Sequence, residues 1–251
     1  MKISERQKQI LNRIVGDYID FAQPISSEFL EKKHKFSVSP ATIRIEMQRL
    51  TDGGFIFQPH TSAGRVPTDK GYRFFVDELI EKGISEFGEE FEIAKCLEEE
   101  IDNTVKFIQL LTKNLAVASS TLALSYLPKA KILWKEGWER VLREPEFREA
   151  ECIFNFANFL KDFEEDIGDF EVNYPSVAKG GNERKFIDSQ IHIYIGKENP
   201  FPRAKNFSII SSRCHLPDEE EGIISLLGPK RMAYDRNIAL INSFKKILEK
   251  L

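Results

Sequence analysis

The order of elements encoded by residues 39–73 constrains the fold of this chain more than any other feature. A helix is predicted over residues 40–52, because Ser39 is a favoured N-cap and the Pro after it suits the first helical position. A Gly-Gly pair ends that helix, and a short apolar strand at residues 55–57 and a polar, turn-rich loop at residues 58–64 come next. Helix, short strand and a loop punctuated by Gly and Pro is the order of parts in a winged helix-turn-helix domain.

Two further helices are predicted before this segment. Residues 4–21 begin with a capping Ser, and their apolar residues recur at spacings of three and four along one face. That face comprises Ile10, Leu11, Ile14, Val15, Tyr18 and Ile19. A second, short helix is predicted over residues 26–33, with Phe29 and Leu30 turned inward. We therefore assign residues 1–80 to a winged helix-turn-helix domain.

The helix at residues 40–52 has two faces of different character. Ile43, Met47 and Leu50 fall on one side at spacings of four and three, as core residues do. The opposite arc suits the major groove of DNA, where Arg reads guanine, Gln reads adenine and an aliphatic group meets the thymine methyl. This arc comprises Ala41, Arg44, Ile45, Gln48 and Arg49. Thr42, near the helix start, is expected to hold a phosphate. The alternative interpretation is an ordinary solvated helix face.

The loop after the short strand also suits contact with nucleic acid. Its side chains are small, polar or basic, and such a hairpin contacts phosphates or places an Arg in the minor groove. The candidate contacts are His60, Thr61, Ser62 and Arg65. For His60 a plain turn role is favoured over metal binding or catalysis. A further helix starts at Asp69, and its Lys70 and Arg73 are expected to flank the DNA backbone.

The charge of the chain is unevenly distributed. The net charge is −4, but residues 1–80 hold twelve Lys and Arg against ten Asp and Glu. The acidic excess therefore lies beyond residue 80. Because binding to a polyphosphate depends on a local basic face and not on the total charge, this division permits DNA binding.

Several classes of protein are not indicated. No apolar run approaches the roughly 20 residues that cross a bilayer, and the N-terminus lacks the apolar centre of a signal peptide. We therefore expect a cytoplasmic protein without a membrane partner. Cys96, Cys152 and Cys214 are scattered and predict neither a disulfide framework nor a metal site. No Gly-rich phosphate loop, zinc-protease helix or nucleophile elbow is present, so neither an enzyme nor a cofactor is expected.

Two segments resemble the HrcA family, bacterial repressors of chaperone genes. They are Ser39-Pro-Ala-Thr-Ile-Arg44 and Gln58-Pro-His-Thr-Ser-Ala-Gly-Arg-Val-Pro-Thr-Asp-Lys-Gly-Tyr-Arg73. The similarity returns in Gly228-Pro-Lys-Arg-Met-Ala-Tyr-Asp-Arg236. The resemblance implies a homodimer that binds an inverted-repeat operator in double-stranded DNA, is kept active by the chaperonin GroEL and is released on heat stress. It also implies a GAF-like domain in the second part of the chain.

The chain departs from the family pattern in two respects. After Arg44 the family commonly continues with Asn and an acidic residue, whereas this chain has Ile45-Glu46, so the usual operator sequence does not follow. The chain is also shorter than the usual member. The missing part is expected between the strand at residues 121–127 and Glu144, where the family has early GAF-like strands and an inserted dimerisation domain.

One long helix is predicted over residues 89–119, within a linker assigned to residues 81–120. Its apolar residues recur with a heptad-like period, which is typical of a helix that faces a partner helix. The stripe comprises Leu97, Ile101, Val105, Ile108, Leu111 and Leu115. It predicts either a dimer seam or a helix that lies on the sheet of its own domain.

Residues 121–251 are predicted to form the regulatory or dimerisation domain. Strands are expected at residues 121–127, 190–195, 207–214 and 223–227, helices at residues 145–166 and 232–251, and a loop at residues 173–185. Most of the Phe rings in the first of these helices are expected in the core. Alternation along residues 190–195 puts His192 and Tyr194 on a polar face.

The fold class is therefore α+β, with an N-terminal winged helix-turn-helix domain followed by a reduced GAF-like α/β domain with long helices. These features favour a dimeric, sequence-specific DNA-binding repressor. Two other classes stay open: a metabolite-sensing winged-helix regulator, and a protein-interaction module that does not bind DNA. A ligand retained through purification would favour the first alternative, and absence of DNA binding the second.

Overall fold

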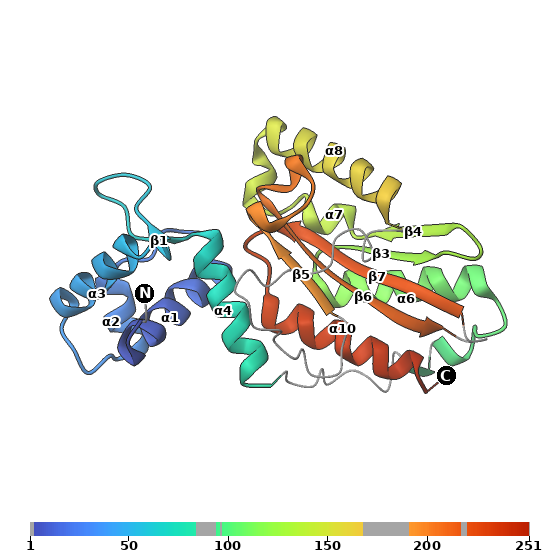
Figure 1. The fold of residues 1–251 in the computed structure, drawn as a ribbon, viewed down its shortest axis with the longest axis horizontal. Helices are drawn as coiled ribbons and strands as arrows, with labels where there is room; N and C mark the ends of the chain where they lie inside the picture. The colour runs from blue at the N-terminus through green and yellow to red at the C-terminus, as the bar shows by residue number, and fades with distance from the viewer. Residues whose placement is uncertain (1–2, 84–93, 96, 168–190, 217–219, 251) are drawn as a thin grey trace. The chain divides into compact units, whose positions relative to one another are not determined.

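The chain divides into two compact units, Met1–Gly83 and Ile84–Leu251. The computed structural model describes residues 3–83, 94–95, 97–167, 191–216 and 220–250 (Figure 1). The loop expected at residues 173–185 lies outside the described residues. Each unit has its own buried core.

Three helices open the first unit: α1 (Glu5–Phe21), α2 (Ser27–His34) and α3 (Pro40–Asp52). Each begins at a Ser whose hydroxyl accepts a backbone N–H from the first turn: Ser4, Ser26 and Ser39. At α1, Gln7 returns a side-chain bond to the backbone of its cap and completes a capping box. These starts agree with the sequence prediction, because capping depends on residues adjacent in the chain.

A hairpin and a fourth helix complete the first unit. β1 (Ile56–Phe57) pairs antiparallel with β2 (Val66–Pro67), and α4 (Asp69–Glu81) follows. The apolar sides of all four helices meet in one core, which includes Ile10, Leu11, Ile14, Val15, Leu30, Ile43, Met47, Leu50, Tyr72 and Val76. The α3 residues predicted to face inward are thus buried.

A buried carboxylate joins α1 to α2. Asp17, almost fully buried, accepts from the ammonium of Lys33 at 2.5 Å and lies 2.7 Å from Nε2 of His34. The same ammonium lies 4.5 Å from the centre of the Phe21 ring. If Lys33 and His34 moved away, the Asp17 carboxylate would be buried without a counter-charge, so this contact holds the end of α2 against α1.

The expectation that Phe29 faces inward is wrong. Its side chain is 36% exposed, whereas Leu30 is fully buried. Successive helical residues point about 100° apart, so a short helix with a narrow buried face cannot turn both into one core. Phe29 instead packs edge-on against Phe21, with ring centres 5.7 Å apart.

The second unit is built on a five-stranded antiparallel sheet in the order β4-β3-β7-β6-β5. Its strands are β3 (Leu122–Leu127), β4 (Ile132–Glu136), β5 (Ile191–Ile195), β6 (Phe207–Leu216) and β7 (Glu220–Pro229). Sequence analysis missed β4. This edge strand is half-buried along its whole length and shows no alternation, and it lies where residues were expected to be missing.

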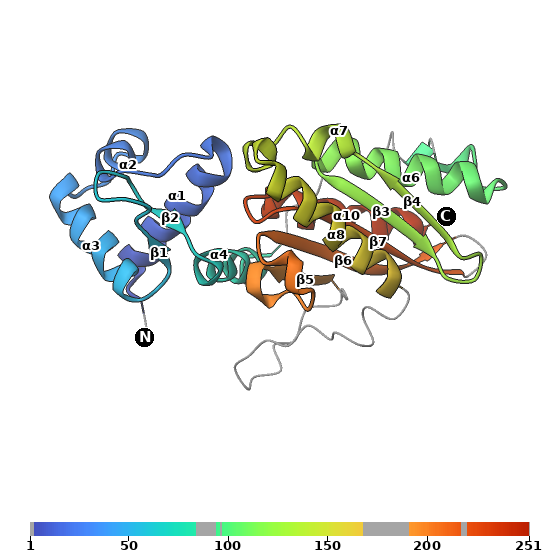
Figure 2. The same ribbon diagram turned by 90° about the horizontal axis from the view of Figure 1, so that it is seen from above.

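Helices cover both faces of this sheet (Figures 1 and 2). α6 (Thr104–Ser119) and α10 (Tyr234–Leu248) contact one face, and α8 (Ala150–Asp166) covers the other. A short helix, α7 (Trp138–Val141), and 3-10 turns at Pro145–Arg148, Gly196–Glu198 and Pro202–Ala204 fill the connections. The helix expected from residue 145 thus begins as a 3-10 turn and becomes α-helical at Ala150.

An aromatic cluster forms the core on the α8 side of the sheet. It includes Phe147, Phe156, Phe159, Phe163, Phe201 and Phe207. Phe159 stacks on Phe207 with ring centres 5.7 Å apart and an interplanar angle of 6°. The expectation that most of the α8 rings are core residues is confirmed, with the exception of Phe154, which is 68% exposed.

The expectation of a polar face on β5 is wrong for Tyr194. This residue is buried in the aromatic cluster, and His192 is partly buried with Nδ1 unpaired. Burial lowers the pKa of His192, and the charges of Arg213 and Lys245 lower it further. Alternation identifies which residues share a face, but it assigns that face to solvent only when no helix covers it.

The prediction of one continuous helix over residues 89–119 is wrong near the middle of that range, although its second half is helical. The chain turns at residues 99–102, and Asn103 caps a new helix, α6; residues 89–93 and 96 lie outside the described residues. Ile108, Leu111 and Leu115 are buried on the unit's own sheet, while Val105 is 46% exposed. These apolar residues of α6 therefore pack on the sheet of their own domain, which was the alternative to a dimer seam.

The aromatic cluster generates a stability prediction. Phe156→Ala is expected to lower the free energy of unfolding of the second unit by about 3–5 kcal/mol, because it leaves a cavity among packed rings. Phe154→Ala, on the same helix but exposed, is the matched control and should change it by less than about 0.5 kcal/mol. Urea unfolding followed by Trp fluorescence measures both, because both Trp residues lie in this unit. Equal midpoints for the two variants would contradict the assigned core.

Candidate nucleic-acid interface

The outer arc of α3 is exposed in the folded unit. Ala41, Arg44, Ile45, Gln48 and Arg49 all reach solvent, whereas the three predicted core residues of this helix are buried. Ile45 is 56% exposed, so an aliphatic side chain stands among the polar ones on this arc. The structure therefore brings together on one surface the side chains that the sequence pattern grouped.

A buried carboxylate anchors α3 and orients one of its arginines. Glu46 is nearly buried; its Oε2 accepts from Nε2 of Gln7 at 2.9 Å, and its Oε1 accepts from Nη1 of Arg49 at 2.9 Å. The first bond ties α3 to α1, and the second holds the Arg49 guanidinium at the edge of the exposed arc. Sequence analysis missed the bond between Gln7 and Glu46, because these residues are distant in the chain.

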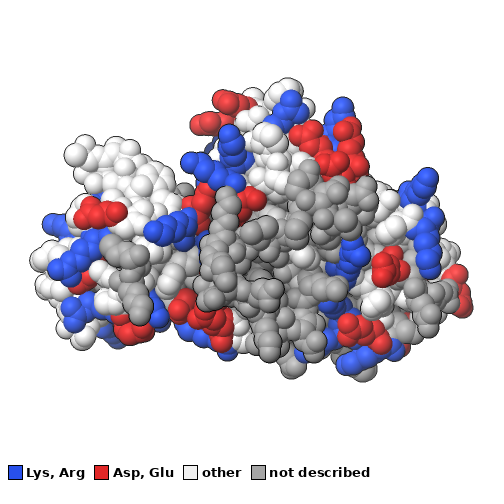
Figure 3. Space-filling view, in the orientation of Figure 1, with Lys and Arg blue, Asp and Glu red and all other residues white. Residues whose placement is uncertain are grey.

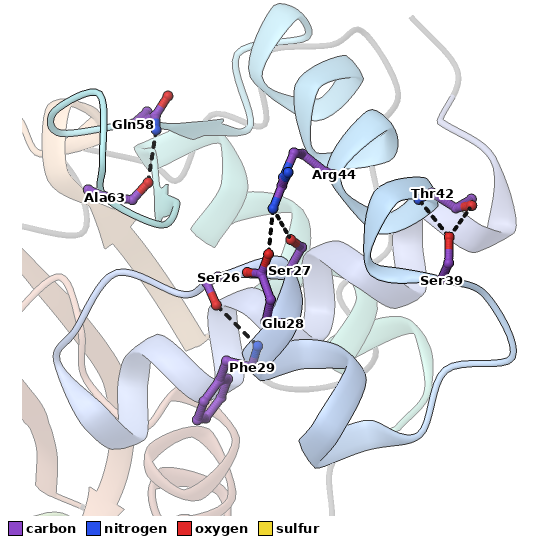
Figure 4. Close-up of polar contacts among 9 residues, drawn as sticks. All are labelled: Ser26, Ser27, Glu28, Phe29, Ser39, Thr42, Arg44, Gln58 and Ala63. Carbon is purple, nitrogen blue, oxygen red and sulfur yellow. Dashed lines mark hydrogen bonds and ion pairs between the residues drawn. The ribbon is translucent and has the colours of Figure 1, made fainter.

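Arg44 is held from the neighbouring helix α2. Its Nη2 forms an ion pair with Oε1 of Glu28 and lies 3.5 Å from the hydroxyl of Ser27 (Figure 4). Both charged side chains stay largely exposed, 66% for Arg44 and 52% for Glu28. Arg44, which is predicted to read a base, is therefore paired with Glu28 and still accessible to solvent.

The hairpin reaches the α3 arc through Arg65. Its Nε donates to the hydroxyl of Thr51 at 3.2 Å, and its Nη2 donates to Oε1 of Gln48 at 3.4 Å. Nε2 of Gln48 donates in turn to Oδ1 of Asp52 at 2.9 Å. Two candidates from separate sequence segments, Gln48 and Arg65, thus lie side by side.

The loop at residues 58–64 is braced by a residue that sequence analysis left out. The amide of Gln58 donates to the carbonyl of Thr61 at 2.9 Å. It also donates to the carbonyl of Ala63 at 2.9 Å, as Figure 4 shows. At the tip, Nδ1 of His60 lies 3.2 Å from the hydroxyl of Ser62. Residues 58–64 hold no Lys, Arg, Asp or Glu, and Figure 3 shows an uncharged lobe at the top of this unit, with both basic and acidic side chains below it.

The base of the hairpin is fixed by close backbone contact. Ile25 and Arg65 exchange two backbone hydrogen bonds, of 2.9 Å and 2.8 Å. A Cβ at Gly64 would come within 2.4 Å of the Ile25 carbonyl carbon, so no larger residue fits there. The connection between α1 and α2 therefore sets the position of the loop.

Three other predicted contacts have partners within the unit. The hydroxyl of Thr42 lies 3.1 Å from that of its cap, Ser39 (Figure 4). The ammonium of Lys70 donates to the carbonyl of Gly53 at 2.7 Å, at the end of α3, where a positive charge stabilises a helix. Arg73 pairs with Asp77 at 3.7 Å. Lys70 thus has a structural role in addition to the one predicted.

The chemistry available at this surface is hydrogen bonding and charge. Two guanidinium groups, one carboxamide and one aliphatic side chain lie on the α3 arc, beside a third guanidinium from the hairpin. In the part of the chain that the structure describes, no group of three or more His, Cys, Asp or Glu is arranged to hold a metal. Among those same residues, no helix combines the length and hydropathy that a membrane span needs.

Comparison with known proteins identifies close relatives of the whole chain. A sequence model described as "HrcA protein C terminal domain" matches residues 69–238. The heat-inducible transcription repressor HrcA of Thermodesulfovibrio yellowstonii is 28% identical, with 98% of this chain and 97% of the relative covered. The protein of the same name from Natranaerobius thermophilus is 29% identical, with 96% and 94% covered. The first alignment spans 340 positions while this chain has 251 residues, so the relative carries insertions.

One solved structure shares the fold. It is a crystal structure described only as a hypothetical protein, with a TM-score of 0.72 and 19% sequence identity. The match covers 99% of this chain and 98% of that one. It supports the arrangement of elements and carries no information on function.

The hairpin base yields a prediction on local stability. In Gly64→Ala, the new methyl group would clash with the Ile25 backbone, so the Ile25 and Arg65 amides should exchange hydrogen at least about tenfold faster. Gly16→Ala is the control, because a Cβ there meets nothing within 4 Å and Ala favours a helix by about 0.5–1 kcal/mol. Hydrogen exchange of the intact chain, read by mass spectrometry, makes the measurement. Unchanged exchange in Gly64→Ala would refute the contact.

Proposed function

The chain belongs to the HrcA family, and from that premise we propose that it is a sequence-specific DNA-binding repressor of heat-shock chaperone operons. In this proposal residues 1–80 form a winged helix-turn-helix domain, with α3 as the recognition helix and the loop at residues 58–64 as the wing. The relatives named above are heat-inducible transcription repressors, which supports a role in transcription.

The exposed arc of α3 carries the proposal. An arc of four exposed side chains, Arg44, Ile45, Gln48 and Arg49, points away from the core of the unit. It matches the donor, acceptor and methyl pattern of the major groove, where Arg pairs with guanine, Gln with adenine and an aliphatic group with thymine.

The hairpin supplies the contacts that orient the domain on DNA. Arg65 lies against Gln48, so an α3 inserted in the major groove carries this guanidinium toward the adjacent backbone or minor groove. His60, Thr61 and Ser62 at the loop tip suit phosphate oxygens, because a lobe without acidic residues does not repel the backbone. Thr42, Lys70 and Arg73 are outer contacts.

A dimer follows from the form of the proposed operator. An inverted repeat presents two equivalent half-sites, and a two-fold symmetric pair of chains matches them when they lie about one helical turn, or a multiple of it, apart. We include release on heat stress and control by the chaperonin GroEL in the proposal, on the strength of the family.

A binding titration tests the proposal. Fluorescence anisotropy would be measured at two salt concentrations on the inverted repeat upstream of the source organism's chaperonin operon and on a scrambled duplex. We expect preferential binding of at least about a thousandfold, with two chains per site. Equal, weak and strongly salt-dependent binding would refute recognition of this inverted repeat by the chain alone, and would mean that the operator has changed with Ile45 or that the chain needs chaperonin or a ligand to become competent. No binding at either salt concentration would instead favour a protein-interaction module.

Arg44→Ala gives a residue-level prediction. The variant should weaken operator binding and relax the preference at one base pair by about 1–3 kcal/mol, because a bidentate contact to guanine is lost. Arg13→Ala removes the same charge from an exposed position on α1, outside the α3 arc, and is the control. Equal losses on operator and random DNA would make Arg44 a phosphate contact instead.

A further inference from the structure

A carboxylate lies beside the α3 arc, where negative charge is unfavourable for a surface that meets phosphates. Glu28 stands in the first turn of α2, is 52% exposed, and pairs with Arg44 (Figure 4). DNA affinity rises with each phosphate that a protein neutralises, so an acidic residue at this place lowers it. A function of Glu28 that compensates for this loss of DNA affinity is therefore expected.

Local structure holds Glu28 ionised and in place. The N-terminus of a helix favours an anion, and the Glu28 carboxylate interacts with its own backbone N–H and with the hydroxyls of Ser26 and Ser27. Its pKa is lowered, first by that backbone N–H, then by the two hydroxyls and Arg44, against the opposing effect of desolvation. Arg44 therefore pairs with an ionised carboxylate.

We infer that Glu28 is a positioning residue for base recognition, which holds the Arg44 guanidinium in the direction from which its remaining N–H groups read one guanine. This inference rests on the proposed function. It assigns a selectivity role to a residue on α2, outside the recognition helix.

The donor count of arginine permits this arrangement. A guanidinium has five N–H donors, and a bidentate contact to guanine uses two of them. Arg44 binds Glu28 through Nη2 alone, so the pair can persist while the other donors meet the base. A long side chain that is already oriented loses less rotamer freedom on binding, a cost of about 0.5–1.5 kcal/mol for a free one.

The ion pair contributes little to folding, which allows its effect on recognition to be measured separately. Both partners are largely exposed, and exposed pairs stabilise proteins only slightly because water and salt screen them. Variants of Glu28 should therefore fold, and the ratio of two DNA affinities does not depend on the fraction of active protein.

The test uses the full chain and a duplex that the wild-type chain selects from a random DNA library. Single-base variants of this duplex identify the guanine pair whose recognition is lost in Arg44→Ala. The discrimination at that pair is then compared in wild type, Glu28→Ala, Arg44→Ala and the double variant. Glu31→Ala removes the same charge from α2 about one turn further on and is the matched control.

We expect Glu28→Ala to reduce discrimination at that base pair by about tenfold, and Glu31→Ala to leave it unchanged. In the double variant the loss should equal that of Arg44→Ala alone, because Glu28 acts through Arg44. Discrimination at the other base pairs should be unaffected.

Two outcomes would overturn the inference while the proposed function stands. Tighter binding of Glu28→Ala to all duplexes, with unchanged discrimination, would make Glu28 a restraint on affinity. Additive losses in the double variant would show that the two residues act independently. Failure of the wild-type chain to select any sequence would overturn the proposed function, and the inference with it.

Discussion

The close approach of the hairpin to the α1–α2 connection is the constraint on which the candidate interface depends. Because Gly64 has no side chain, the backbones of Ile25 and Arg65 come close enough to exchange two hydrogen bonds. That exchange fixes where Arg65 leaves the hairpin, and its guanidinium then reaches Thr51 and Gln48 on α3. Without it, the loop would be attached to the unit only by its two-residue strands.

The polar side chains of the interface are organised before any partner is present. Arg49 rests on a buried Glu46, Gln48 lies between Arg65 and Asp52, and Arg44 is paired with α2. Each exposed pair adds little to stability, since water competes for the same groups. Their common effect is to restrict rotamers, which favours selectivity for a partner of matching geometry over indiscriminate attraction to negative charge.

In the second unit, helices cover both faces of one sheet. α6 and α10 fill one side and the Phe-rich α8 the other, so residues that alternate along a strand are buried on both sides. This explains why Tyr194 is a core residue and why the apolar stripe of α6 is used within the chain. Large hydrophobic side chains that stay exposed, among them Val105 on α6 and Phe154 on α8, lie on helix surfaces away from the sheet.

The sequence by itself determined the features that depend on neighbouring residues. Ser caps at Ser4 and Ser39, the Gly pair after α3 and the spacing of Ile43, Met47 and Leu50 set the helix limits and the exposed arc, because capping and periodicity act within a few residues. Only the tertiary structure decided that Glu28 pairs with Arg44, that Arg65 reaches Gln48 and that α6 lies on its own sheet. Those contacts join residues far apart in the chain, and periodicity specifies an apolar face without specifying what covers it.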